Sequence, residues 1–367
     1  MSQTSRHPLK RLALTTGGGD APGLNAVIRA ATQSALNRGL EVVGIRDGYC
    51  GIIAGEPCIP LVRETVRSIA GLGGTILGTT NCANPFEFRT HFPGSTRRAL
   101  AAEIVVSELK RQKIDGVIAI GGDGSMSIAY RLYRMGVQVI GVPKTIDNDL
   151  LGTERTFGFD TAVATATDCI DKLQTTAQAH GRTMVIEVMG RHAGWIALHA
   201  GISASADVIL IPEIPYTMKN VAAFLNERRK SGRASAIVVV AEGAREREGA
   251  EILQKKTVKG HEPLLGGAGQ YVATQIEQRT GADTRALVLG HIQRGGSPTT
   301  YDRLLGLRYG TAAVRLAEAG RWGQMVSFQP PGMTSTSLES TIGGRKCVDV
   351  NSDTVLTARE LGICLGD

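Results

Sequence analysis

The sequence has few aromatic residues and no closely spaced cysteines, and both absences narrow the function. Only 4% of the 367 residues are Phe, Trp or Tyr, so a surface that stacks the bases of single-stranded nucleic acid is not expected. The six cysteines include no CxxC pair, which argues against a zinc site and against a disulfide scaffold. Cysteines scattered in this way fit a reducing compartment, so we expect a cytoplasmic protein.

Long apolar runs and dense blocks of one charge are also missing. No run approaches the roughly 18 apolar residues that a membrane-spanning helix needs. The polar start of the chain shows no secretory signal, and we expect residues 1–8 to form a loose tail. The formal net charge is +7 without any long basic cluster. This excess is ordinary for a soluble protein, and it also suits a cationic cleft for phosphorylated small molecules; nucleic acid is not indicated as a partner.

The sequence does contain a regular alternation of short apolar runs and helix-like segments. Its length exceeds the size at which one hydrophobic core usually divides, so two domains are expected. The predicted strands are 12–16, 41–45, 115–120, 137–142, 183–188, 207–211, 236–241 and 285–290, with a first helix at 24–39. Because these strands are apolar throughout, helices should cover both faces of each sheet. The predicted fold class is α/β: two doubly wound, mostly parallel, three-layer α/β/α domains with the active site between them.

The expected domain boundaries follow from this alternation. Residues 9–145 and about 260–315 should form one α/β domain, and about 146–258 with the C-terminal segment should form the other. The polar, glycine-rich stretch 246–269 predicts a loop or crossover. The strand at 285–290 is expected to return to the first domain. The C-terminal residues carry little pattern.

Several predicted strands end in glycine-rich or charged stretches, at the edge where parallel sheets bind ligands. In "IGGDGS", Asp123 could hold Mg²⁺ on the phosphates of a nucleotide, and Gly122, Gly124 and Ser125 could line the phosphate path. A carboxylate at position 124 would repel an α-phosphate. The alternative is a turn in which Asp123 caps a helix. The earlier stretch "TGGGDAPGLN" suits an anion at a helix N-terminus, or a tight structural turn.

The stretch "PKTIDND" places two carboxylates after another strand. Transfer of a phosphoryl group to an alcohol needs a group that takes the hydroxyl proton, and a carboxylate can do this. If the segment stays extended, Asp147 and Asp149 share a face, so that one acts as base while the other orients it or assists the metal. The alternative for Asp147 is a local Asx-turn.

Further candidate binding residues, most of them charged, follow or precede the remaining strands. Arginines that converge on one site suit a phosphate monoester, because the guanidinium group makes forked hydrogen bonds. The candidates are Arg182, Met189, Gly190, Arg191, Arg285, His291 and Arg294. Glu242 could accept hydrogen bonds from sugar hydroxyls. Each residue taken singly has an ordinary structural explanation, but together they favour a phosphosugar cleft.

The sequence closely resembles the phosphofructokinase family. The matching stretches are "GGGDAPGLNAVIRA", "GGDGS", "PKTIDNDL", "GFDTA", "VMGRHAGWIA", "AEGA" and "LGHIQRGGSP", in family order from about residue 10 to 315. The resemblance implies transfer of a phosphoryl group from ATP, with Mg²⁺, to the 1-hydroxyl of fructose 6-phosphate. It assigns the nucleotide to the first domain and the sugar to the second.

The resemblance also implies a role for each matching residue. Asp147 would be the base, Thr145 and Asp147 would touch the sugar and the incoming phosphoryl group, and Asp123 would hold Mg²⁺. Gly19, Gly122, Gly124 and Ser125 would line ATP. The residues expected to bind fructose 6-phosphate are Met189, Gly190, Arg191, Glu242, His291 and Arg294, with Arg191 also counted as catalytic. Arg182 and Arg285 would reach the 6-phosphate of a neighbouring subunit, which implies a homo-oligomer, either dimer or tetramer.

Two positions bear on the identity of the phosphoryl donor. ATP-dependent members typically have glycine at the position of Gly124, whereas pyrophosphate-dependent members have aspartate there and lysine at the position of Lys144. This chain is mixed, and it resembles the mixed ATP/pyrophosphate branch. Because only a small neutral residue leaves room for an α-phosphate, ATP is expected. Lys144 leaves open a pyrophosphate-dependent enzyme. Asn81 replaces a usual arginine that contacts the phosphates of the phosphoryl donor, which leaves open a catalytically silent regulatory paralogue. Another sugar phosphate as acceptor also stays possible.

Overall fold

The computed structural model describes residues 9–81, 84–247, 253–255 and 264–367. The chain divides into two compact units. Unit 1 runs to Thr145 and also contains Leu150–Gly158 and Arg294–Gly344. Unit 2 contains Ile146–Asp149, Phe159–Gln293 and Arg345–Asp367. The predicted tail and much of the predicted loop at 246–269 lie outside the described residues.

Unit 1 is built on a seven-stranded sheet with the order β15-β14-β7-β6-β1-β2-β3. Its strands are β1 Arg11–Thr16, β2 Glu41–Gly44, β3 Ile59–Pro60, β6 Gly116–Gly121, β7 Val139–Pro143, β14 Gln324–Gln329 and β15 Gly332–Ser337. The central strands are parallel, and only the outermost strands β3 and β15 run antiparallel to their neighbours. A separate hairpin joins β4 Arg89–His91 to β5 Arg98–Leu100.

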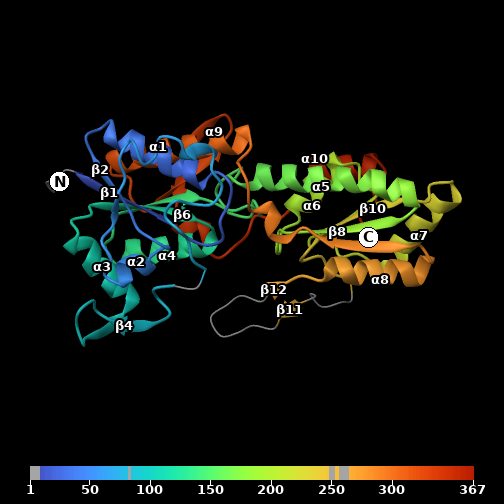
Figure 1. The fold of residues 1–367 in the computed structure, drawn as a ribbon, viewed down its shortest axis with the longest axis horizontal. Helices are drawn as coiled ribbons and strands as arrows, with labels where there is room; N and C mark the ends of the chain where they lie inside the picture. Colours follow the sequence, from blue (N-terminus) through green and yellow to red (C-terminus); the bar gives the residue numbers. More distant parts are fainter. Residues whose placement is uncertain (1–8, 82–83, 248–252, 256–263) are drawn as a thin grey trace. The chain divides into compact units, whose positions relative to one another are not determined.

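Alternating side chains of this sheet enter two different apolar cores. Leu12 and Leu14 of β1 pack on one face with helices α1 and α9, whereas Ala13 lies in the core on the other face with α2, α3 and α4. Figure 1 shows the two helical layers on opposite sides of the strands. The helices are α1 Leu24–Leu36, α2 Cys50–Ile53, α3 Ala101–Arg111, α4 Asp123–Arg134 and α9 Thr300–Glu318. The three-layer arrangement predicted for this region is confirmed.

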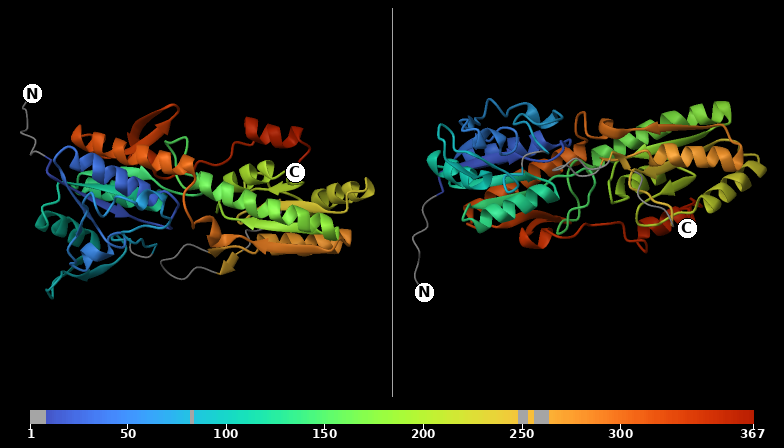
Figure 2. Two further views of the ribbon diagram at one scale, coloured as in Figure 1. Left: turned by 45° about the horizontal axis from the view of Figure 1, so that its top comes forward. Right: turned by 90° about the horizontal axis from the view of Figure 1, so that it is seen from below.

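Helices α1 and α9 pack against each other on one face of the unit 1 sheet (Figure 2). Apolar residues recur along α1 with helical spacing, so one face of it is buried. Gly310 of α9 meets that face; a Cβ added there would lie 2.5 Å from the carbonyl oxygen of Val27. Gly310 therefore permits the close packing of α9 on α1 in this helical layer.

Unit 2 has a four-stranded parallel sheet with the order β13-β8-β10-β9. The strands are β8 Thr183–Val188, β9 Val208–Leu210, β10 Ala236–Ala241 and β13 Thr284–Val288. Helices α5 and α6 lie on one face of the sheet and α8 on the other (Figure 1). The helices of unit 2 are α5 Phe159–His180, α6 Trp195–Ser203, α7 Met218–Lys230, α8 Ala268–Thr280 and α10 Asp353–Glu360. A small pair, β11 Leu253–Lys255 and β12 Leu264–Leu265, completes the unit.

The last third of the chain differs from the sequence expectation. The prediction that the strand at 285–290 returns to the first domain is wrong, because β13 pairs with β8 and α8 packs on both strands. The chain returns to unit 1 only at Arg294, rather than near residue 260. There it forms the helix α9 and the strands β14 and β15, and the sequence pattern did not indicate these two strands. An apolar strand carries no local sign of which sheet it will join, so sequence alone could not decide this.

None of the helices among the described residues is both long and apolar enough to cross a bilayer.

Candidate active site

Two glycine loops lie side by side at the carboxyl edge of the unit 1 sheet. The first, 17–20, follows β1, and the second, 121–125, follows the neighbouring strand β6. The side chain of Ser125 fills the space between them. A Cβ at Gly17 would lie 2.8 Å from the Ser125 Oγ, and a Cβ at Gly121 only 2.2 Å from it. Glycine at both positions allows the two loops to approach each other.

Helix α4 begins inside the second glycine loop. Asp123 is the first residue of the helix, is exposed, and accepts a hydrogen bond from the Gly124 amide at 2.7 Å. Gly122 occupies the N-cap position, so the structure does not support the alternative in which Asp123 is the cap. With no capping side chain, the first amides of α4 and its helix dipole can face an anion.

Gly124 borders open space. A Cβ built on this residue meets no atom within 4 Å, and its backbone is not in the left-handed region. Neither packing among the described residues nor backbone conformation therefore requires glycine here. The space beside Gly124 is available to a bound molecule.

Two cationic side chains reach the first glycine loop from elsewhere in unit 1. The Lys144 Nζ donates to the carbonyl of Gly19 at 2.5 Å, and this lysine is only 3% exposed. The Arg294 Nη1 donates to the carbonyl of Asp20 at 3.2 Å. Arg294, predicted to bind the sugar, thus lies against the loop predicted to bind the nucleotide. These two cations make the surroundings of the loop favourable to phosphate groups.

The predicted catalytic segment passes from unit 1 to unit 2 after Thr145. Thr145 and Asp147 are 9% and 5% exposed. Asn148 adopts a left-handed conformation, with φ at 53°, and is also buried. The segment therefore bends, so the condition under which Asp147 and Asp149 were expected to share a face, an extended segment, is not met. Asn tolerates the left-handed region better than most residues do, which explains the bend at this position.

In unit 2, four of the predicted sugar-binding residues, Met189, Gly190, Arg191 and Glu242, follow the carboxyl ends of β8 and β10. The Arg191 amide donates to the Glu242 carboxylate at 3.0 Å. The backbones approach so closely that a Cβ at Gly243 would lie 1.8 Å from the Arg191 carbonyl oxygen. Gly190, with φ at 139°, forms the turn that permits this approach. Burial raises the pKa of Glu242, and the hydrogen bond from Arg191 opposes the shift.

The structure adds one residue that the sequence reasoning missed. The side chain of Gln293 is completely buried. Its Oε1 accepts from the Met189 amide at 3.4 Å, and its Nε2 donates to the Gly290 carbonyl at 3.0 Å. Gln293 thus braces the Met189 turn against the short helix η2 Gly290–Gln293, which carries the exposed His291. Only its position inside "GHIQRGG" could have drawn attention to it.

Arg182 and Arg285 lie at the opposite end of the unit 2 strands. Arg182 precedes β8, and Arg285 is the second residue of the parallel strand β13. Both form ion pairs with Asp283, at 2.6 Å and 2.5 Å, and Arg182 lowers the pKa of Asp283. A strand of six residues spans about 20 Å, so these arginines do not join Arg191 and Glu242 in one cluster within the chain.

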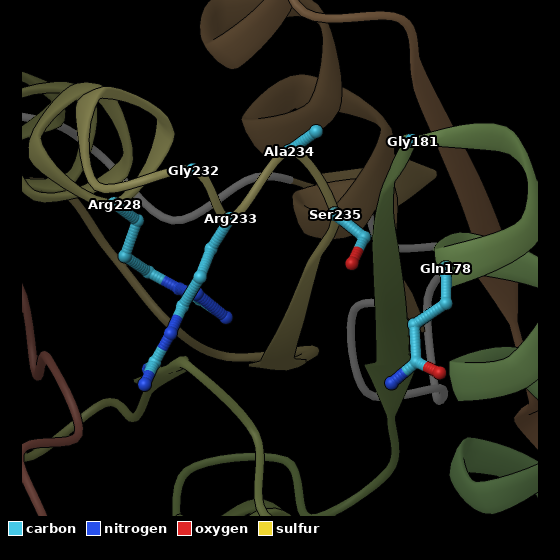
Figure 3. A pocket seen from close by; sticks show the side chains of 7 residues that line it. All are labelled: Gln178, Gly181, Arg228, Gly232, Arg233, Ala234 and Ser235. Carbon is cyan, nitrogen blue, oxygen red and sulfur yellow. The ribbon is translucent and has the colours of Figure 1, made fainter.

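A cavity of about 490 Å³ opens at this same amino end of the strands. Its lining residues are Gln178, Gly181, Arg228, Gly232, Arg233, Ala234 and Ser235 (Figure 3). None of them is a predicted site residue. Since ligands of parallel α/β sheets bind at the carboxyl ends of strands, the candidate ligand-binding residues are the glycine loops in unit 1 and, separately, Arg191 and Glu242 in unit 2, rather than the residues of this cavity.

Comparison with known proteins identifies relatives along almost the entire chain. The sequence pattern of the family described as "Phosphofructokinase" matches residues 11–317. The "ATP-dependent 6-phosphofructokinase" of Chloroflexus aggregans is 49% identical over 363 residues, covering 98% of each chain. The "Pyrophosphate--fructose 6-phosphate 1-phosphotransferase" of Amycolatopsis methanolica is 46% identical, covering 92% of this chain and 96% of that one.

Solved structures agree with the fold. A phosphofructokinase structure from Saccharomyces cerevisiae superposes with a TM-score of 0.76 at 29% identity, covering 90% of this chain. The present chain spans 44% of that longer chain. A structure titled as a pyrophosphate-dependent phosphofructokinase from Marinobacter aquaeolei gives a TM-score of 0.79 over 98% of this chain, at 21% identity. The α/β fold class predicted from the sequence is confirmed.

Proposed function

Because the chain belongs to the phosphofructokinase family, we propose that it is an ATP-dependent 6-phosphofructokinase. It transfers the γ-phosphoryl group of ATP to the 1-hydroxyl of fructose 6-phosphate, giving fructose 1,6-bisphosphate and ADP. The observation that carries the choice of ATP is the open space beside Gly124 at the N-terminus of α4. A nucleotide needs room there for its α-phosphate, whereas an aspartate would fill and charge that space.

Unit 1 supplies the ATP site in this proposal. Gly19, Gly122, Gly124 and Ser125 line the phosphates, because their loops expose backbone amides and carry little side-chain bulk. Lys144 is already placed against Gly19, and it provides the positive charge that Asn81 lacks. Charge near the transferring phosphoryl group stabilises the transition state more than the ground state, so Lys144 should act on kcat as well as on binding.

Asp123 fits the role of magnesium ligand. Mg²⁺ in phosphoryl transfer is commonly held by one or two carboxylates together with the phosphates of the substrate. An exposed carboxylate at the start of α4, beside the open space at Gly124, suits that arrangement. The part of the chain that the structure describes contains no cluster of three metal-binding side chains, and this chemistry does not require one. The bound ion would neutralise charge on the phosphates.

Unit 2 supplies the base and most of the residues that bind the sugar. Met189, Gly190, Arg191, Glu242 and His291 of this unit hold fructose 6-phosphate, and Arg294 of unit 1 is the remaining residue of the set. A carboxylate has about four lone-pair positions, so Glu242 can accept from the Arg191 amide and from a sugar hydroxyl together. Asp147 takes the proton of the sugar's 1-hydroxyl. The hydroxyl oxygen then bonds to the γ-phosphorus of ATP, and the bond between the γ-phosphorus and the oxygen that remains on ADP breaks. Thr145 orients the two reactants beside it.

The same chemistry with pyrophosphate is the second candidate. The buried Lys144 beside Gly19 favours it, as does the similarity to the pyrophosphate-named relative from Amycolatopsis methanolica. A lysine can pair with the phosphates of either substrate, so we rank this function below ATP dependence.

We also propose a cytoplasmic homo-oligomer, dimer or tetramer, with shared sites. Arg182 and Arg285 lie about a strand length from Arg191 within one chain, so they would serve the 6-phosphate of a neighbouring subunit. The edge strand β13 and the short helix η2 after it support an interface, because Leu287 and Val288 of the strand and Ile292 of η2 are 43%, 55% and 55% exposed. A cytoplasmic location suits an enzyme of sugar phosphates whose described cysteines form no disulfide.

The test is a steady-state assay of the purified full chain with fructose 6-phosphate and Mg²⁺, using ATP and pyrophosphate in separate reactions. We expect a much larger kcat/KM with ATP. Activity with pyrophosphate alone would support the second candidate. A folded wild-type protein that is inert with both would instead indicate a silent sugar-binding paralogue.

A further inference from the structure

The C-terminal segment of unit 2 runs along the loop that carries the proposed base. After the chain leaves unit 1, the Lys346 amide donates to the Asp149 carbonyl at 2.8 Å. The Lys346 Nζ donates to the Asn148 Oδ1 at 3.3 Å. One residue, far from the loop in the sequence, thus contacts two neighbouring residues of the loop 146–149, through its backbone and through its side chain.

Lys346 is itself held by the start of helix α6. The Trp195 Nε1 donates to the Lys346 carbonyl at 2.8 Å, and the Lys346 ammonium lies 5.6 Å from the centroid of the Trp195 ring. Two residues further on, the Val348 amide donates to the Glu213 carboxylate at 2.8 Å. Glu213 also accepts from the Gly194 amide at 3.0 Å. The segment is therefore fixed to the turn that follows the proposed sugar-binding residues.

The backbone conformation of the loop 146–149 depends on its surroundings. Residues other than glycine rarely adopt the left-handed region, and asparagine adopts it more readily than most. Asn148 has φ at 53° while only 3% exposed. The direction of the chain at Asn148 decides where the preceding side chain, that of Asp147, lies.

We propose that Lys346 is a positioning residue for the phosphoryl-transfer reaction. By bonding the Asn148 side chain and the Asp149 backbone, it holds the left-handed turn that aims the Asp147 carboxylate at the acceptor hydroxyl. Lys346 does not touch the reactants, and it acts through Asn148. The inference rests on the proposed function, in which Asp147 is the base. A misplacement of about 1 Å can cost on the order of 100-fold in rate, so a small loosening of this turn is sufficient to matter.

The test compares Lys346→Met with Lys346→Arg in the full-length protein. Lys346→Met keeps most of the side-chain length but removes the charge and the hydrogen bond. We expect kcat to fall about 10- to 100-fold, while the KM for fructose 6-phosphate changes less than about threefold. Lys346→Arg should recover most of the lost kcat, because it restores a cation that can donate to Asn148. The matched control is Arg345→Met, which removes an exposed charge from the same segment and should leave both constants within about twofold of wild type.

Trp195 fluorescence separates positioning from simple loss of structure. The chain has two tryptophans, so a Trp322→Phe background leaves Trp195 as the only indole. We expect Lys346→Met to keep the Trp195 emission maximum and the melting temperature while kcat falls. A Lys346→Met enzyme with wild-type kcat would overturn the inference. So would a kcat loss that Lys346→Arg does not restore and that accompanies a red-shifted emission, since the segment would then have detached. A wild type inert with both phosphoryl donors would refute the proposed function, and the inference with it.

Discussion

The proposed nucleotide side in unit 1 and the proposed sugar side in unit 2 are built in different ways. Unit 1 offers backbone amides, short loops and open space, with the exposed Asp123 and the unobstructed Gly124 at the start of α4. Unit 2 offers side chains in a buried network, in which Glu242 and Gln293 already bond to backbone amides. A long, highly charged phosphate chain suits the first construction, and a sugar that must be held in one orientation suits the second.

This difference predicts how substitutions will lower activity. In unit 1, a substitution acts mainly by altering the charge and the space available to a bound ligand. In unit 2, a change also disturbs neighbours whose hydrogen bonds depend on the altered side chain.

The largest effect should come from the proposed base. Asp147→Asn keeps the shape of the side chain but cannot take the hydroxyl proton at neutral pH. We expect kcat to fall by about 10²- to 10⁴-fold, with a smaller change in the KM for fructose 6-phosphate. Steady-state kinetics beside a melting curve would measure this. If Asp147→Asn retained wild-type kcat, the base would have to be another group.

Gly124→Asp should come next, and it tests the open construction of unit 1 directly. No atom lies within 4 Å of a Cβ at this position, so the melting temperature should barely change. We expect kcat/KM for ATP to fall at least about 100-fold, because like charges placed against each other cost several kcal/mol. The control is Gly124→Ala, which adds bulk without charge and should keep most ATP-dependent activity. An aspartate variant that still used ATP well would remove the main reason for choosing ATP.

Arg182→Ala should give an intermediate effect. Loss of a hydrogen bond to a charged group costs about 1.5–3 kcal/mol, so the KM for fructose 6-phosphate should rise about 10- to 100-fold. If sites are shared between subunits, mixing Arg182→Ala subunits with Asp147→Asn subunits should restore part of the activity. A strict absence of recovery after verified subunit exchange would argue that each chain builds its own site.

The smallest effect should appear in the pH dependence of sugar binding. Burial raises the pKa of Glu242 above its ordinary value of 4.5. As the pH falls through this raised pKa, the carboxylate gains a proton and accepts fewer hydrogen bonds from the sugar. We therefore expect the KM for fructose 6-phosphate to rise on acidification at a higher pH than an ordinary glutamate would give, by less than about tenfold. Glu242→Gln, which has no such titration, should lose this component; an unchanged profile would exclude Glu242 as its source.

Protonation of Glu242 is expected to weaken sugar binding, but because its pKa is raised in the folded state, protonation favours folding. A group whose pKa is higher in the folded state binds its proton more tightly there, so its contribution favours folding fully below the unfolded pKa. That contribution is lost as the pH rises through the folded value. The stability of Glu242→Gln relative to wild type should therefore be higher at neutral pH than at acidic pH. Melting temperatures of both proteins at the two pH values would show this.

The sequence alone was sufficient to predict structural features formed by residues that are close together in the chain. Strand β1 is contiguous with its glycine loop, and strand β6 is contiguous with its glycine loop and the start of α4. Apolar runs and glycine spacing therefore identified each of these two stretches. The same holds for the turn at Gly190 and Arg191. Side-chain chemistry within such a stretch depends on few distant contacts, and the family motifs record it.

Only the tertiary structure showed which segments that are far apart in the chain contact one another. It placed β13 in the second sheet, set Arg294 against the first glycine loop, and showed a bend at Asn148, whose conformation the sequence had left undecided. It also brought Lys346 to that loop from a segment with almost no pattern. Pairing between segments far apart in the chain depends on shape and packing across the fold, and no short stretch of residues carries that information.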